Sequence, residues 1–166
     1  DANLKAYQKA FGEVGVVLSE EKYRECFGFR FDRFMEVMGI SEKETIVRIK
    51  SLKKDYYPLF FESLHPNDAL IGLIRSFKCF GGKTAIASTA RKENLMNALK
   101  YLGIVDLFDL IYTGQDVENG KPSPEIYDKT MAELQVQPSD TLIFEDSEVG
   151  LQAAKASGAY FIKITF

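Results

Sequence analysis

Three short apolar runs in the second half of the chain each stop at polar side chains, and each is followed by a helical pattern. A fourth apolar run follows at 160–164. Alternating strand and helix patterns are typical of an α/β sheet with parallel strands. We therefore expect a Rossmann-like α/β fold whose parallel sheet is covered by helices on both faces. The three runs and the polar residues that end them are 84–87 with Ser88, 110–112 with Thr113, and 141–144 with Glu145 and Asp146.

The polar residues after these runs are expected to meet at one edge of the sheet. In open α/β sheets, ligands bind in the crevice outside the carboxyl ends of the strands. Lys121 lies a short loop beyond the second run, so its ammonium would join the hydroxyl of Ser88 there. The adjacent carboxylates of Glu145 and Asp146 would complete the group. A hydroxyl, an ammonium and two carboxylates are the functional groups that a metal-assisted phosphoryl-transfer site uses.

Each of these assignments has a simpler alternative. Ser88 and Thr89 could form a turn whose hydroxyls bond the nearby backbone, or they could donate to a phosphate near a helix N-terminus. Lys121 could be a solvated loop lysine, or it could neutralise phosphate charge. Asp146 could be a helix cap, but two adjacent carboxylates after an apolar strand create a repulsion that a divalent cation relieves. Mg²⁺ suits such a pair, because it takes few carboxylates and fills its other positions with water and substrate oxygens.

Composition and charge exclude several classes of protein. A net charge of −3 is not typical of a nucleic-acid-binding protein. The aromatic residues also do not alternate with a series of basic residues. No apolar run approaches the roughly 18 residues of a membrane span, and no secretory signal is visible. Cys26 and Cys79 make no disulfide framework and are expected to be free thiols. The expectation is a soluble, cytoplasmic protein without nucleic-acid or membrane partners.

The pattern changes near residue 66 and predicts two parts. Residues 1–66 are helical, aromatic and charged, without strand alternation, so several short helices should pack as a small bundle. Residues 67–166 carry the strand and helix units of an α/β core. In the loop after the second strand, Ser123 is expected to cap a helix whose first residue is Pro124.

Taken in order, the polar segments resemble three motifs of the haloacid-dehalogenase-like phosphohydrolase superfamily. Residues 85–89 (Ala-Ile-Ala-Ser-Thr) are similar to its second motif, a strand that ends in Ser or Thr. Residues 120–124 (Gly-Lys-Pro-Ser-Pro) are similar to the third, and residues 144–150 (Phe-Glu-Asp-Ser-Glu-Val-Gly) to the fourth. The fourth looks like the form found in the subgroup of β-phosphoglucomutase and many small-phosphate phosphatases. The resemblance covers nearly the whole chain and implies that residues 1–66 are the helical cap of that subgroup.

The resemblance implies a Mg²⁺-dependent phosphoric monoester hydrolase that acts on a small phosphorylated metabolite, such as a sugar phosphate. Ser88 and Lys121 would be catalytic, and Glu145 and Asp146 would hold Mg²⁺. The family's first motif, Asp-x-Asp-x-Thr, supplies a nucleophilic and an acid/base aspartate on a first strand, and it is absent from the sequence. We expect that strand upstream of residue 1, and we expect residues 1–166 alone to be inactive for lack of the nucleophile.

Four residues are predicted to bind the substrate. Thr89 and Arg91 follow the first strand, where Arg91 would reach a second anionic group at the mouth of the site. The resemblance implies the same role for Arg30 and Lys53 in the cap; for each charged residue the alternative is a solvated surface charge. A phosphosugar mutase and a non-catalytic binding protein on a degenerate core are the other functions considered. Asn3 favours a phosphatase, because the mutases tend to carry a basic residue in that region.

Overall fold

The first part of the protein consists of helices. The computed structural model describes residues 2–165, and we call residues 2–63 the helical lobe. Its elements are α1 (Ala2–Gly12), α2 (Glu20–Glu25), α3 (Phe31–Val37), α4 (Lys43–Tyr56) and the 3₁₀ helix η1 (Tyr57–Ser63). Apolar side chains at helical spacing form one core cluster that includes Phe11, Met35 and Ile49. The described part of the lobe contains no strand, as the sequence pattern predicts.

Local chemistry sets the ends of these helices. Ser19 caps α2, because its Oγ accepts a hydrogen bond from the backbone N–H of Lys22 at 3.0 Å. Pro58 lacks the N–H that would continue α4, and the chain changes there to η1. Both features follow from the residue types at these positions.

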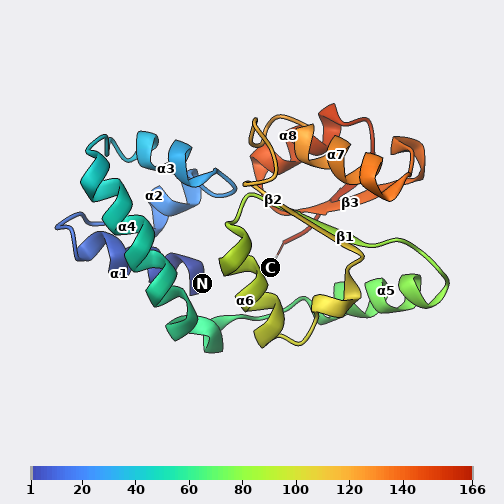
Figure 1. Cartoon of the computed structure of the whole chain (residues 1–166), viewed down its shortest axis with the longest axis horizontal. Coiled ribbons are helices and arrows are strands. Elements are labelled where there is room, and N and C mark those ends of the chain that lie inside the picture. The colour runs from blue at the N-terminus through green and yellow to red at the C-terminus, as the bar shows by residue number, and fades with distance from the viewer. Residues whose placement is uncertain (1, 166) are drawn as a thin grey trace.

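From Asp68 onward, helices alternate with strands. The elements are α5 (Asp68–Cys79), β1 (Ala85–Ser88), α6 (Lys92–Tyr101), η2 (Val105–Leu107), β2 (Leu110–Thr113), α7 (Glu125–Leu134), η3 (Pro138–Asp140), β3 (Leu142–Glu145), α8 (Glu148–Ala156) and β4 (Tyr160–Lys163). Figure 1 shows α7 and α8 on one side of the strands and α5 and α6 on the other, with the helical lobe beside them. The α/β architecture with helices on both faces is confirmed. None of the helices in the described residues has the length and apolar character of a membrane span.

The four strands form two parallel pairs. β1 pairs with β2, so that Ser88 lies opposite Thr113, and β3 pairs with β4, so that Glu145 lies opposite Lys163. Within the described residues, no strand pairing joins the two sheets. The expectation that every strand is buried on both faces is wrong for β4, whose four residues are all exposed. The carboxyl ends of β1 and β3 nevertheless carry the polar residues that the sequence singled out.

An apolar cavity of about 750 Å³ lies between β1 and β3. We call it the inter-strand cavity. Helix α5 contributes apolar side chains to its wall, and two of them, Leu73 and Phe77, are more than half exposed. Both strands, α7 and the neighbouring loops contribute the rest of the wall. The cavity is therefore bounded by the strand edges of β1 and β3 that have no partner among residues 2–165.

Helix α7 begins one residue later than the sequence predicted. Its first residue is Glu125 and its N-cap is Pro124, in place of Ser123 at the cap and Pro124 at the first helical position. Ser123 still helps the helix start, because its Oγ accepts a hydrogen bond from the N–H of Glu125 at 3.3 Å. The shift leaves Ser123 in the loop that carries Lys121.

Candidate functional site

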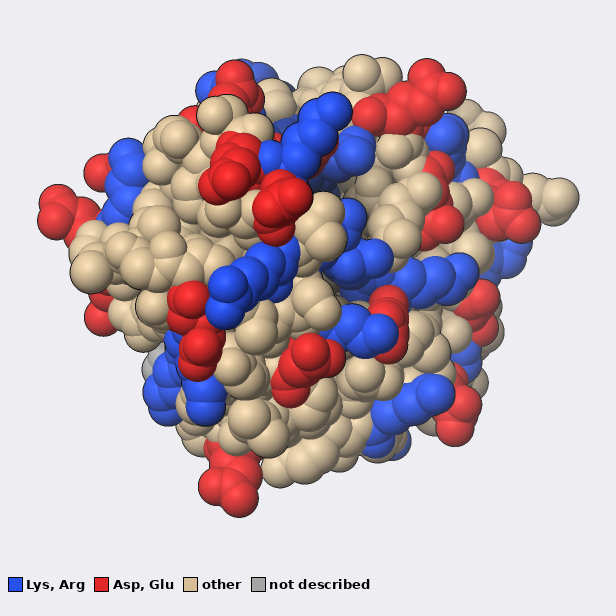
Figure 2. Space-filling view, turned by 60° about the vertical axis from the view of Figure 1, so that its left-hand side comes forward, with Lys and Arg blue, Asp and Glu red and all other residues tan. Residues whose placement is uncertain are grey.

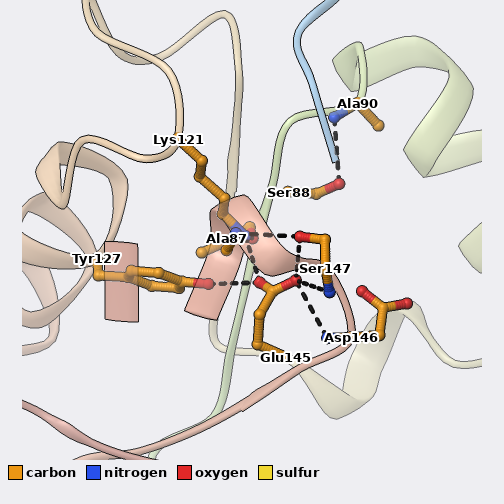
Figure 3. Close-up of polar contacts among 9 residues, drawn as sticks. Ala87, Ser88, Ala90, Lys121, Tyr127, Glu145, Asp146 and Ser147 are labelled. Atoms are coloured by element: carbon orange, nitrogen blue, oxygen red, sulfur yellow. Dashed lines mark hydrogen bonds and ion pairs between the residues drawn. The ribbon is translucent and has the colours of Figure 1, made fainter. Parts of the chain in front are cut away.

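Lys121 and Glu145 form a buried ion pair at the carboxyl ends of β1 and β3. Nζ of Lys121 lies 2.6 Å from Oε2 of Glu145, and the two side chains are only 6% and 7% exposed. The same Nζ donates to the carbonyl oxygen of Ala87 on β1 at 3.2 Å. The alternative of a solvated loop lysine is therefore wrong. One ammonium group connects two strands that belong to different sheets (Figure 3).

The carboxylate of Glu145 is fully occupied by donors from the protein. Oε2 accepts from Lys121 Nζ and from the hydroxyl of Tyr127, both at 2.6 Å. Oε1 accepts from Ser147 Oγ at 2.7 Å and from the N–H groups of Asp146 and Ser147 at 3.1 and 3.0 Å. Burial alone would raise the pKa of Glu145, but the charge of Lys121 and these hydrogen bonds outweigh it and hold the pKa at about 2. Glu145 is therefore ionised, with little capacity left for a metal ion.

Tyr127 belongs to this network, although the sequence motifs did not single it out. It lies in the first turn of α7 and is 5% exposed. Burial, followed by the hydrogen bond to Glu145, raises the pKa of Tyr127 far above its ordinary value. The sequence signal that could have identified Tyr127 is its position in the first turn of the helix that follows Lys121. A polar hydroxyl on a buried helix face needs a partner.

Asp146 and Glu145 both line the open cleft described below, but their carboxylates point in different directions. Figure 3 shows the carboxylate of Asp146 directed away from Lys121 and Tyr127. Burial, and then the proximity of Glu145, raise the pKa of Asp146 to about 6. Asp146 is not the helix cap: Ser147 is, since its Oγ accepts from the N–H of Gly150 at 3.1 Å. A carboxylate so weakly stabilised by the protein is a suitable ligand for a cation.

Ser88 and Thr89 lie where β1 ends, and both line the cleft. Oγ of Ser88 accepts a hydrogen bond from the N–H of Ala90 at 3.2 Å, so the bond to the nearby backbone that was considered as the simpler alternative is present. The bond uses Ser88 as an acceptor and leaves its hydroxyl proton available as a donor. α6 begins at Lys92, so the start of a helix lies a few residues from both hydroxyls.

A cleft of about 440 Å³ separates these strand ends from the helical lobe. Its core wall contains Ser88, Lys121 and Asp146, three of the residues that the sequence expected to converge. Its lobe wall is rich in hydrogen-bond donors and contains Asn3, Tyr7, Tyr23, Lys50, Lys53 and Tyr57. The structure thus brings the strand-end residues together and places a second set of polar groups opposite them.

Lys53 is a buried cation on the lobe wall of the cleft. It is 7% exposed, and its Nζ lies 4.0 Å from the ring centre of Tyr57 and 5.1 Å from that of Tyr7. Burial, and then the charge of Arg91, lower the pKa of Lys53 to about 8. Neither Lys53 nor Arg91, which also lines the cleft, forms an ion pair with any residue from 2 to 165. Two cations without carboxylate partners therefore face the same space.

Arg30 lies elsewhere. It is not part of the cleft wall, and its Nη1 donates to the carbonyl oxygen of Glu118 at 2.9 Å. Its aliphatic stem covers Gly120, where an added Cβ would lie 2.3 Å from Arg30 Cδ. Arg30 therefore connects the helical lobe to the loop that carries Lys121, in a position unlike that of Lys53.

The molecular surface carries both signs of charge. In Figure 2, lysine and arginine side chains gather across the centre of the face, with aspartate and glutamate side chains between and around them. This face therefore carries both signs of charge, with basic side chains at its centre. A local basic region of this kind raises the concentration of small anions near it.

Comparison with known proteins gives a consistent assignment. Residues 1–164 match the family model of haloacid dehalogenase-like hydrolases. The bifunctional riboflavin kinase/FMN phosphatase of Arabidopsis thaliana is 32% identical over 92% of this chain, which spans 44% of that protein. The phosphorylated carbohydrates phosphatase of Thermotoga maritima is 27% identical over 93% of this chain and 73% of its own length.

A solved structure agrees with these sequence matches. A variant of CbbY from Rhodobacter sphaeroides, in complex with xylulose-1,5-bisphosphate, has a TM-score of 0.83 and 27% sequence identity. The alignment covers 96% of this chain and 77% of that one. The solved structure and the family match thus agree on the fold of this chain.

Proposed function

Because the chain belongs to the haloacid dehalogenase-like hydrolases, we propose that it forms most of a Mg²⁺-dependent phosphatase for a small phosphorylated metabolite. The observation that carries the proposal is the convergence of Ser88, Lys121 and Asp146 on one cleft at the carboxyl ends of β1 and β3. Those groups can donate to a phosphoryl oxygen, balance its charge and hold a cation. Phosphoryl transfer depends mainly on such positioning and electrostatics.

The proposed nucleophile is an aspartate on a strand outside residues 1–166. The inter-strand cavity is apolar and is bounded by the edges of β1 and β3. An inserted parallel strand would bond to both edges and would end beside Ser88 and Glu145. A carboxylate at that end would face the cleft, so the cavity supports the expectation that the first motif docks there.

The chemistry follows from that arrangement. One oxygen of the strand aspartate would bond to phosphorus as the bond to the ester oxygen breaks, and a second aspartate would protonate the leaving oxygen. The second aspartate would then take a proton from water, whose oxygen displaces the first aspartate and releases phosphate. Ser88 would donate a hydrogen bond from its hydroxyl to a phosphoryl oxygen. Lys121 would offer the N–H that neither Ala87 nor Glu145 accepts.

Among the carboxylates of residues 2–165, Asp146 fits Mg²⁺ best. Residues 2–165 contain no cluster of three or more His, Cys, Asp or Glu side chains that could hold a metal ion. Mg²⁺ accepts such a sparse site, because it retains water and binds substrate phosphate. We propose that Asp146 holds the ion together with a carboxylate of the docked strand, and that Glu145 acts through Lys121 instead. The bound ion would supply positive charge to the phosphoryl group.

We propose that the preferred substrate carries a second anionic group. Lys53 and Arg91 line the cleft without carboxylate partners among residues 2–165, and Tyr7 and Tyr57 lie on the lobe wall beside Lys53. A second phosphate or a carboxylate would pair both cations. The structure of a CbbY variant with a sugar bisphosphate is a precedent for this class of ligand.

The test is phosphate release by the full-length protein from sugar monophosphates, sugar bisphosphates and FMN, with and without Mg²⁺. We expect Mg²⁺-dependent release, with the lowest KM for a bisphosphate. Ser88→Ala should lower kcat by about 100- to 1000-fold, as for the loss of one donor to a developing oxyanion. Ser76→Ala, on the exposed face of α5, is the matched control and should retain full turnover.

Two outcomes would reject the proposal. Isomerisation of a sugar phosphate without net phosphate release would identify a mutase. Binding of the same esters without any turnover would identify a non-catalytic binding protein.

A further inference from the structure

Tyr127 contacts both members of the buried ion pair, and it does so with different atoms. Its hydroxyl donates to Oε2 of Glu145 at 2.6 Å. The face of its ring lies beneath Lys121, whose Nζ is 4.8 Å from the ring centre. Tyr127 is 5% exposed, so the rigid start of α7 fixes both contacts.

We propose that Tyr127 is a positioning residue that sets the place of the Lys121 ammonium at the cleft. The catalytic consequence rests on the function proposed above. An ammonium has three N–H donors. Ala87 and Glu145 accept two of them, and no third acceptor is found among residues 2–165. The direction of the third N–H, toward the cleft that Lys121 lines, therefore depends on how Glu145 and the ring hold the ammonium.

The hydroxyl matters because it shares Oε2 with Lys121. A carboxylate oxygen that accepts two short bonds is held at a defined point between its donors. Without the hydroxyl, Oε2 would have Lys121 as its single side-chain donor, and the carboxylate could turn and draw the ammonium away from the cleft. The ring adds a cation–π contact with the ammonium.

The experiment compares two Tyr→Phe variants of the full-length protein. Tyr127→Phe retains the ring and removes the hydroxyl. Tyr112→Phe is the control, because Tyr112 packs against the same core cluster and its hydroxyl forms no hydrogen bond within residues 2–165. We expect kcat of Tyr127→Phe to fall by about 10- to 100-fold, as for a lost hydrogen bond to a charged group. KM should change by less than about twofold, and Tyr112→Phe should match the parent.

Coupling to Lys121 separates positioning from a general structural effect. In a Lys121→Met background, Tyr127→Phe should cause no further loss of kcat, because the group that it positions is gone. An equal loss in both backgrounds would overturn the proposal. So would a Tyr127→Phe variant with parental kcat.

NMR spectroscopy of the Lys121 ammonium tests the positioning role independently of enzymatic activity. In protein with ¹⁵N-labelled lysine, the buried Lys121 ammonium should give a slowly exchanging signal, assigned by its absence in Lys121→Met. Tyr127→Phe should shift this signal and accelerate its exchange, and Tyr112→Phe should not. An unchanged signal in Tyr127→Phe would overturn the positioning role. Absence of phosphatase activity in the parent would reject the proposed function alone.

Discussion

Gly150 leaves the space that the carboxylate of Glu145 occupies. A Cβ added at Gly150 would lie 2.0 Å from Cδ of Glu145 and 2.3 Å from each of its carboxylate oxygens. Glu145 cannot easily move aside, because five hydrogen bonds hold its two oxygens. The glycine five residues after Glu145 is therefore required by the side chain of the glutamate, and the spacing of the two residues has a physical cause.

Gly150→Ala should destabilise the protein by about 1–3 kcal/mol, the range for an overpacked core, and should lower kcat because Glu145 supports Lys121. Gly72→Ala is the control: Gly72 lies within α5 with no atom within 4 Å of an added Cβ. That change should stabilise the helix by about 0.5–1 kcal/mol. Urea unfolding measures both variants. If both variants changed the free energy of unfolding by the same amount, the close approach of Gly150 to Glu145 would be contradicted.

Lys121→Met should destabilise the protein by about 3–5 kcal/mol, because it leaves the Glu145 carboxylate buried without its cation. The double variant Lys121→Met/Glu145→Gln removes both charges and should be more stable than Lys121→Met alone. Thermal unfolding of the three proteins tests the pair, and a double variant less stable than Lys121→Met would refute it.

Lys53 should give the site a pH dependence. Its folded pKa of about 8 lies below the ordinary 10.5, so between these values the folded protein binds fewer protons than the unfolded chain. Relative to Lys53→Met, stability should therefore rise as the pH increases through that window. Arg91, Tyr7 and Tyr57 are the other charged or titratable groups around it. Unfolding measured at several pH values tests the sign, and a parallel pH dependence in both proteins would contradict it.

Loss of the Lys53 charge should also affect binding. KM for a sugar bisphosphate should rise as the pH passes about 8. KM for a monophosphate without a second anion should change less.

Asp146→Asn should abolish Mg²⁺ binding, whereas Glu145→Gln should retain it within a few fold. The reason is that the oxygens of Glu145 already accept five hydrogen bonds, whereas the carboxylate of Asp146 is directed away from Lys121 and Tyr127. Because one carboxylate makes a poor site, residues 1–166 alone should bind Mg²⁺ at roughly millimolar concentration. Calorimetry on the parent and both variants gives the affinities. Parental affinity in Asp146→Asn would rule out the assignment.

Residues 1–166 alone should release negligible phosphate from small esters, with or without Mg²⁺, because they lack the proposed nucleophile. Extending the chain upstream by a strand with Asp-x-Asp should raise both the melting temperature and the Mg²⁺-dependent turnover, since the strand would pair with β1 and β3 across the inter-strand cavity. The same extension with both aspartates changed to asparagine is the control: it should gain stability only. Turnover of about 1 s⁻¹ or more by residues 1–166 would place the nucleophile within them.

Local pattern was sufficient to predict most elements and the strand-end residues. Apolar runs, glycines and caps act over a few residues, so Ser88 and Asp146 could be assigned to strand ends without a structure. The environment of each side chain was not predictable in this way. The burial of Lys121 could not be predicted from its polar loop, because it depends on Glu145, 24 residues further on.

Long-range contacts account for the remaining differences. Arg30 bonds to Glu118, 88 residues away, and Tyr127 bonds to Glu145 across the interface of α7 and β3. No short motif encodes such a pair, because it depends on how two elements pack. The exposure of β4 likewise depends on what covers the strand, which its apolar sequence does not specify.

The ion pair between Lys121 and Glu145 also limits how this protein can be adapted to heat. Replacing a buried ion pair by well-packed apolar side chains often makes a protein more stable. Here the same ammonium bonds to β1, to β3 and, in the proposed reaction, to the phosphoryl group. An apolar substitute could fill the space between the two strands, but it could not donate a hydrogen bond to the phosphoryl group. Heat-adapted relatives that retain the reaction should therefore keep this pair and gain their stability in the helices around it.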